Sequence, residues 1–179
     1  MEIIKINAQK LTPESFAPYG FVISSEGRTP DFSNERGTTG WEFPVEAGQV
    51  RMFLLETKYQ GLEFTKLEKH THVSQVFFPA GGSKAVLLVA KAKDNNSLPS
   101  VNNIKAFLLD GTVGYGLYKH TWHSLDRLPV SKPSTLWVMV TDHETQQEMP
   151  YVNSGKAKHT VEISTQEAFK AVIQVSVNI

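Results

Sequence analysis

Short runs of β-forming residues recur along the chain and are separated by turns that contain glycine or proline. We expect strands over 21–23, 50–55, 85–90, 104–109, 114–123 and 135–141, with one or two more between 64 and 78. Two short helices are expected, one capped by Thr12 and one opening with the capping box Ser164-Thr165-Gln166-Glu167. Many short strands with little helix predict an all-β fold, an antiparallel sandwich or barrel.

The composition is that of an ordinary globular chain of 179 residues, and we expect a single domain over residues 1–179. The 18 basic side chains balance the 18 acidic ones, so no net charge attracts nucleic acid or an anionic membrane. With no cysteine, a metal site would need histidine, carboxylate or amide ligands. The N-terminal residues lack the pattern of a signal peptide, and we expect a cytoplasmic protein. The segment 24–48 is expected to form a long loop with short strand fragments.

His70 and His72 stand two residues apart in a β-rich run that continues with Gln75. Alternate side chains of a strand share one face, so we expect the two imidazoles to project together toward a metal ion or a substrate. The alternative is that they are unrelated surface histidines on an edge strand.

A third histidine lies downstream in the segment Leu117-Tyr118-Lys119-His120-Thr121-Trp122-His123. Strand alternation places His120 and His123 on opposite faces, and we expect His123 to be the one that faces the pocket. A His-x-His pair, a following amide or carboxylate and a distant third histidine resemble the pocket of cupin barrels. This likeness predicts a cupin-type double-stranded β-helix, or jelly-roll barrel, with short terminal helices.

The candidate metal ligands are His70, His72, Gln75 and His123. This set of imidazole and amide groups would suit one divalent ion, zinc, manganese, iron or nickel, and the sequence does not choose among them. We expect no organic cofactor. His143 and His159 lie in polar segments and are expected at the surface.

Several stretches resemble the ureidoglycolate lyase family. They are the run from Leu11 to Ile23 with its Tyr19-Gly20 turn, the block Leu67-Glu68-Lys69-His70 with Gln75, Phe77 and Pro79, and the pair Trp122-His123. The chain departs from the family pattern at Thr71-His72, at Leu117-Tyr118 and at Ser124-Leu125.

The resemblance implies a cupin barrel, commonly a homodimer, that releases urea and glyoxylate from ureidoglycolate, a small carboxylate substrate. His70 and His123 match the family block and are the first candidates for proton transfer, since imidazoles titrate near neutrality. Gln75 would orient the substrate, and Tyr118 and His120 are second candidates. Two alternatives stay open: a metal-dependent cupin isomerase or oxygenase, and a cupin that binds a small ligand without catalysis.

Overall fold

The computed structural model of the protein describes residues 1–33, 39–46 and 48–178. In this part of the chain, eight strands pair as four hairpins nested one inside the next. From the innermost outward, the pairs are β9 (Ala85–Ala90) with β10 (Lys105–Leu109), β8 (Gln75–Pro79) with β11 (Gly114–Leu117), β7 (Lys66–His70) with β12 (Trp122–Ser124), and β5 (Val50–Lys58) with β14 (Ser134–Asp142).

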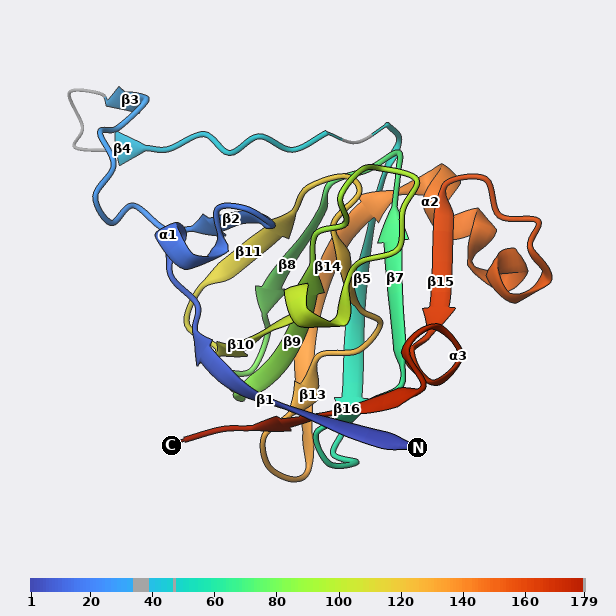
Figure 1. Ribbon diagram of the computed structural model, residues 1–179. Coiled ribbons are helices and arrows are strands. Elements are labelled where there is room, and N and C mark those ends of the chain that lie inside the picture. The colour runs from blue at the N-terminus through green and yellow to red at the C-terminus, as the bar shows by residue number, and fades with distance from the viewer. Residues whose placement is uncertain (34–38, 47, 179) are drawn as a thin grey trace.

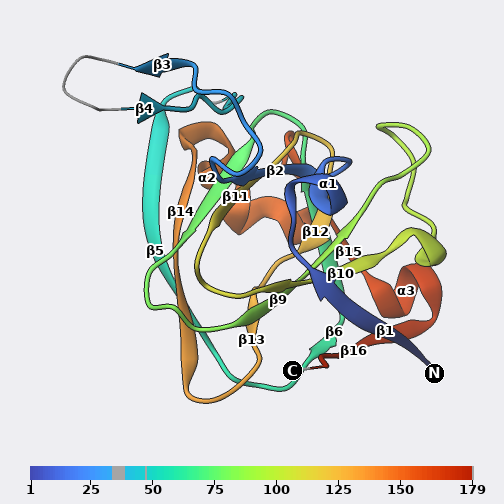
Figure 2. The same cartoon turned by 90° about the vertical axis from the view of Figure 1, so that its left-hand side faces the viewer.

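Successive pairs fall alternately in a larger and a smaller sheet, which face each other (Figures 1 and 2). A long hairpin folded over in this way is a jelly roll, the architecture of cupins. The structure therefore confirms the predicted all-β jelly-roll barrel with short helices.

Additional strands extend both sheets. In the larger sheet, β15 (Thr160–Ser164) pairs with β7, while β1 (Glu2–Lys10) runs parallel to both β10 and β16 (Ala171–Ser176). The short strands β6 (Glu63–Phe64) and β13 (Leu128–Pro129) pair with β16 and β9. In the smaller sheet, β2 (Gly20–Ile23) pairs with β11. Strands β3 (Phe32–Ser33) and β4 (Thr39–Gly40) pair with each other as a separate two-stranded sheet. Both lie within the segment 24–48, which was expected as a loop with strand fragments.

The helices begin at polar capping residues. Thr12 caps α1 (Pro13–Phe16), Asp142 caps α2 (His143–Glu148) and Ser164 caps α3 (Thr165–Phe169), each through a side-chain oxygen that accepts a backbone N–H. Two 3₁₀ turns, η1 (Val101–Asn103) and η2 (Met149–Ser154), complete the set. None of the helices in the described ranges is both long and apolar enough to cross a membrane.

Strand β9 is buried on both faces and separates two apolar clusters, as its unbroken aliphatic run predicts. Leu87 and Val89 pack between the sheets with Phe77, Tyr115 and other side chains of the smaller sheet. Val86 and Leu88 point to the other side, where β16 and α3 contribute to a second cluster. The face of the larger sheet that carries Leu87 and Val89 is therefore the interior of the barrel.

The expected β region 64–78 and the expected strand 114–123 are each interrupted by a turn. Strand β7 ends at His70 and the chain bends through Thr71 before β8 begins, so the two-residue alternation does not extend to His72. The expectation that His70 and His72 share a face is therefore wrong. The expected strand 114–123 is likewise interrupted between β11 and β12, where His120 takes a left-handed backbone conformation with φ 64°.

Candidate active site

The interior face of the larger sheet carries three titratable side chains at one end of the barrel. Glu68 and His70 alternate along β7 and so share a face, while His123 on β12 lies directly opposite Glu68 in the register. His123 is also opposite Val89, whose side chain lies in the interior cluster. The three side chains, which we call the interior triad, are almost wholly buried.

The ring nitrogens of the interior triad converge on the carboxylate. His123 Nε2 lies 3.3 Å from Glu68 Oε1, and His70 Nε2 lies 3.6 Å from the same oxygen. His123 Nδ1 is 3.0 Å from the carbonyl oxygen of Thr121, which can only accept, so Nδ1 carries the hydrogen and Nε2 of a neutral ring is an acceptor. His70 Nδ1 lies 3.0 Å from the hydroxyl of Thr160 on β15, which fixes the second ring.

Burial and mutual contact set the charges of these groups. Burial alone would raise the pKa of the Glu68 carboxyl, but its contacts with His123 and His70 outweigh burial and hold this pKa well below the usual range. Burial lowers the pKa of His123 despite the opposing effect of Glu68, and the charges of His70 and Arg127 lower it further. At neutral pH the site therefore pairs an ionised carboxylate with a neutral His123 imidazole.

The interior triad fits a divalent metal ion. Glu68 Oε2, His70 Nε2 and His123 Nε2 are buried and make no hydrogen bond to any described residue. The Glu68 oxygens and the Nε2 of neutral His123 are all acceptors, and acceptor atoms so close together repel one another unless a proton or a cation lies between them. Ligand atoms of a tetrahedral zinc site with bonds of 2.0–2.1 Å lie roughly 3.3 Å apart, close to the separations found here. Two imidazoles and a carboxylate are also a common ligand set for catalytic zinc and iron.

Arg127 is a buried cation inside the barrel that sequence reasoning did not identify. Its Nε donates to the Tyr115 hydroxyl at 2.8 Å, one terminal nitrogen donates to the Leu125 carbonyl at 2.9 Å, and the guanidinium lies 3.6 Å from the centre of the Phe77 ring. The other terminal nitrogen makes no hydrogen bond within the described ranges. A buried guanidinium with a free donor can hold an anionic group.

The remaining candidates, Gln75, Tyr118 and His120, differ in position and in exposure. Gln75 is buried at the start of β8, opposite Leu117 and on the same face as Phe77, and therefore faces the barrel interior. Tyr118 is partly exposed and packs beside Phe21. His120 contacts His70 through a backbone hydrogen bond, in which the His120 N–H donates to the His70 carbonyl at 2.8 Å.

The structure does not bring His72 to the interior triad. Its Nε2 lies 3.3 Å from Glu144 on α2, and its ring lies 4.7 Å from the ring of His159. The bend after β7 carries His72 to the surface, so it cannot share a metal ion with His70 and His123. Of the four predicted metal ligands, two belong to the interior triad, and Glu68 supplies a carboxylate that was not predicted.

Residues 41–46, which follow β4, cross the end of the barrel at which β7 ends with His70 and β8 begins with Gln75 (Figure 1). The carbonyl of Glu46 accepts the N–H of Ser74 at 2.8 Å, and its carboxylate pairs with Lys119. Phe43 stacks on Phe21 with 5.7 Å between ring centroids. Glu46 thus contacts both turns that flank the interior triad. It contacts turn 71–74 through Ser74 and turn 118–121 through Lys119.

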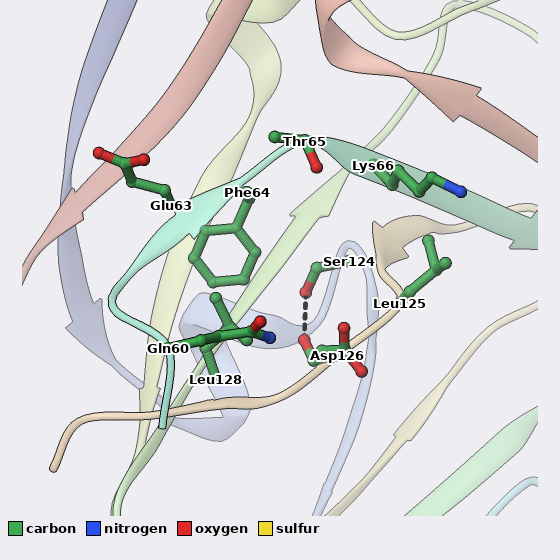
Figure 3. A pocket seen from close by; sticks show the side chains of 9 residues that line it. All are labelled: Gln60, Glu63, Phe64, Thr65, Lys66, Ser124, Leu125, Asp126 and Leu128. Carbon is green, nitrogen blue, oxygen red and sulfur yellow. Dashed lines mark hydrogen bonds between the residues drawn. The ribbon is translucent and has the colours of Figure 1, made fainter. Parts of the chain in front are cut away.

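A separate surface hollow lies where β6 and β7 meet the loop after β12 (Figure 3). It is lined by Phe64, Lys66 and Leu128 among others, and Ser124 Oγ donates to the Asp126 carbonyl at its edge. None of the predicted site residues lines this hollow.

The fold is a jelly-roll barrel, an architecture that cupins share, and its interior holds a buried cluster of two histidines and a carboxylate. The sequence model of the ureidoglycolate lyase family matches residues 3–162. The chain therefore belongs to the ureidoglycolate lyase family, a family of carbon–nitrogen lyases.

Individual relatives agree with this assignment. The chain is 31% identical over 131 residues to a ureidoglycolate lyase of Pseudomonas paraeruginosa, covering 69% of this chain and 75% of that protein. It is 29% identical over 131 residues to the ureidoglycolate lyase of Brucella anthropi, with the same coverage. Among solved structures, RmlC from Streptococcus suis in complex with dTDP-D-xylose matches 72% of this chain and 61% of its own, with 11% identity and a TM-score of 0.37. A likeness as distant as this carries no functional inference.

Proposed function

We propose that this protein releases urea and glyoxylate from ureidoglycolate within the barrel interior, at the interior triad. The observation that supports this most strongly is the convergence of Glu68, His70 and His123 in a member of a ureidoglycolate lyase family. Ureidoglycolate is a carbinolamine. Its cleavage removes the hydroxyl proton, forms the carbonyl of glyoxylate, breaks the carbon–nitrogen bond and returns a proton to the urea nitrogen.

We further propose that Glu68, His70 and His123 hold one divalent metal ion. When bound, such an ion would supply Lewis acidity, which would ease loss of the hydroxyl proton of the substrate. Direct proton transfer by His70 and His123 is the alternative. The geometry favours the metal-holding role, because both Nε2 atoms face the ionised Glu68 carboxylate rather than open space.

Arg127 and Gln75 are the proposed substrate-binding groups. The guanidinium of Arg127 has a free donor for the substrate carboxylate, and its charge reaches the interior triad, since it lowers the pKa of His123. The amide of Gln75 faces the same interior and can donate to the ureido carbonyl or the carboxylate. Tyr118 and His120 stay second candidates.

The test is release of glyoxylate from racemic ureidoglycolate, followed for the wild-type protein and for Glu68→Gln and His123→Asn. We expect turnover well above the spontaneous rate in the wild type and at least about a 100-fold loss in each variant, the lower end of what a single catalytic group contributes. Circular dichroism would verify the fold of both variants. Wild-type protein that releases no glyoxylate would contradict the proposed substrate.

A further inference from the structure

A second cluster of metal-ligating side chains lies at the surface, apart from the interior triad. His72 follows the end of β7, Glu144 lies in the first turn of α2, and His159 precedes β15. The end of β7, α2 and the start of β15 lie together at one corner of the molecule (Figure 1). Residues far apart in the sequence thus supply three ligand atoms to one place, which we call the corner cluster.

The separations within the corner cluster are close to those around a metal ion. His72 Nε2 lies 3.3 Å from Glu144 Oε2, and His159 Nε2 lies 4.0 Å from the same oxygen. The ligand atoms of all three residues lie within 4.8 Å of one another. Since ligand atoms around tetrahedral zinc lie roughly 3.3 Å apart, the His72–Glu144 pair is already at this spacing and His159 needs a small movement.

Asp142 provides an independent indication of a cation at this place. Its side chain is 1% exposed, and Oδ1 caps α2 by accepting the Thr145 N–H at 2.7 Å. Its other oxygen, Oδ2, is buried without a hydrogen bond in the described part of the chain and lies 3.9 Å from His72 Nε2. A buried carboxylate oxygen without a donor is costly, and a cation held by His72 would offset that cost.

The charges around the corner cluster favour a cation over an anion. Glu148 adds a third carboxylate, with Oε1 3.8 Å from His159 Nε2 and Oε2 accepting the His159 N–H at 2.7 Å. Lys156 and Lys158 line the adjoining hollow, but among the described residues neither forms an ion pair with these carboxylates. Imidazole and carboxylate ligands together suit zinc and similar divalent transition metals.

We propose that His72, Glu144 and His159 bind a divalent transition-metal ion of the zinc type, with the Asp142 carboxylate as a further oxygen partner. The ion would join the β7–β8 turn, α2 and the start of β15, and so would stabilise the folded protein by an amount that grows with the logarithm of its affinity. This site shares no residue with the interior triad and does not depend on the proposed lyase activity.

The test is a zinc titration of chelator-treated protein against a chromophoric competitor, with native mass spectrometry to count bound ions. We compare the wild type with His72→Asn, His159→Asn and the control His143→Asn. His143 is also on α2, next to Glu144, but its Nδ1 accepts from Arg51 Nε at 3.1 Å. We expect the wild type and His143→Asn to bind one more ion per chain than either cluster variant. In His72→Asn and His159→Asn, the affinity for that additional ion should be lower than in the wild type by at least roughly 10–100-fold, which is what loss of an outer-shell partner costs.

A second measurement on the wild type avoids any variant that fails to fold. Zinc should shift the imidazole carbon-bound proton resonances of both His72 and His159 in the NMR spectrum, in addition to any shift of His70 and His123. Equal ion counts in the wild type and both cluster variants would overturn the proposal. So would unshifted resonances of His72 and His159 at saturating zinc, or an equal loss of the ion in His143→Asn.

Discussion

At the scale of single residues, the interior triad is defined by one unusual arrangement: two buried imidazole Nε2 atoms are directed at one ionised carboxylate, and the Nε2 of the neutral His123 ring carries no hydrogen. Such an arrangement is unfavourable in the empty site and favourable once a cation is bound. The same side chains that would destabilise an empty barrel thus give it affinity for a metal ion.

Arg127 offers the clearest prediction at this scale. Arg127→Met keeps an apolar contact with Phe77 and removes the donors, so kcat/KM for ureidoglycolate should fall roughly 10–100-fold, the effect of losing about 1.5–3 kcal/mol from a charged hydrogen bond. Most of the loss should appear as a higher KM, measured by initial rates. The matched control is Arg51→Met on the exposed strand β5, which should be neutral. Unchanged kinetics in a folded Arg127→Met protein would remove Arg127 from the site.

The sequence predicted part of the interior triad. His70 and His123 were identified as neighbours across two strands, and the structure places them 5.3 Å apart between ring centroids. Glu68 follows from the same alternation rule, because it stands two residues before His70, whereas the cupin pattern places its carboxylate or amide after the histidines. Arg127 gave no signal, because it lies in an irregular stretch between β12 and β13 where no periodicity indicates which way a side chain points.

At the scale of elements, β15 matters because it adds an edge to the jelly roll beside β7 and supplies Thr160 to the His70 ring. The hydroxyl fixes the orientation of His70 in the manner of an outer-shell partner of a metal ligand. An element outside the four nested hairpins thus takes part in building the site.

We therefore predict that Thr160→Val weakens metal binding at the interior triad by roughly 10–100-fold. Thr160→Ser keeps the hydroxyl and should retain most of the affinity. Both substitutions are measured by metal titration in a His72→Asn background, which removes the corner cluster from the count. Equal affinities for the Val and Ser variants would show that β15 does not position His70.

Elements with strong local signals were predicted well, and elements that depend on tertiary context were not. The caps at Thr12 and Ser164 and the aliphatic run of β9 were all identified from the sequence. Strands β1 and β16 were missed, because they pair in parallel between chain ends distant in sequence and have no turn to mark them. The break after His70 carries no such signal, since residues 71–74 contain no glycine or proline.

At the scale of the whole molecule, the outer face of the smaller sheet is unusually apolar. Leu54 on β5, Val138 on β14 and Phe78 on β8 lie in one row across the sheet, and Val50 and Met52 continue the apolar line along β5. Leu54 is 66% exposed and Met52 is 72% exposed. A contiguous apolar patch on an edge strand is typical of a protein–protein interface.

The family resemblance implies a homodimer, and we propose that this apolar face forms its interface. Light scattering after gel filtration should give the mass of a dimer for the wild type and of a monomer for Met52→Glu, because the buried charge would oppose association. Leu98→Glu, in the exposed loop before η1, is the control and should remain dimeric. A monomeric wild type would contradict the interface.

The measurement that tests the central claim most directly is glyoxylate release from racemic ureidoglycolate before chelation, after chelation, and after metal is returned. The account predicts turnover above the spontaneous rate that is lost with the chelator and restored by a divalent ion, in the wild type and in His72→Asn alike. Turnover that survives complete removal of metal would contradict the metal-holding role of Glu68, His70 and His123, and would leave direct proton transfer by the two histidines as the mechanism.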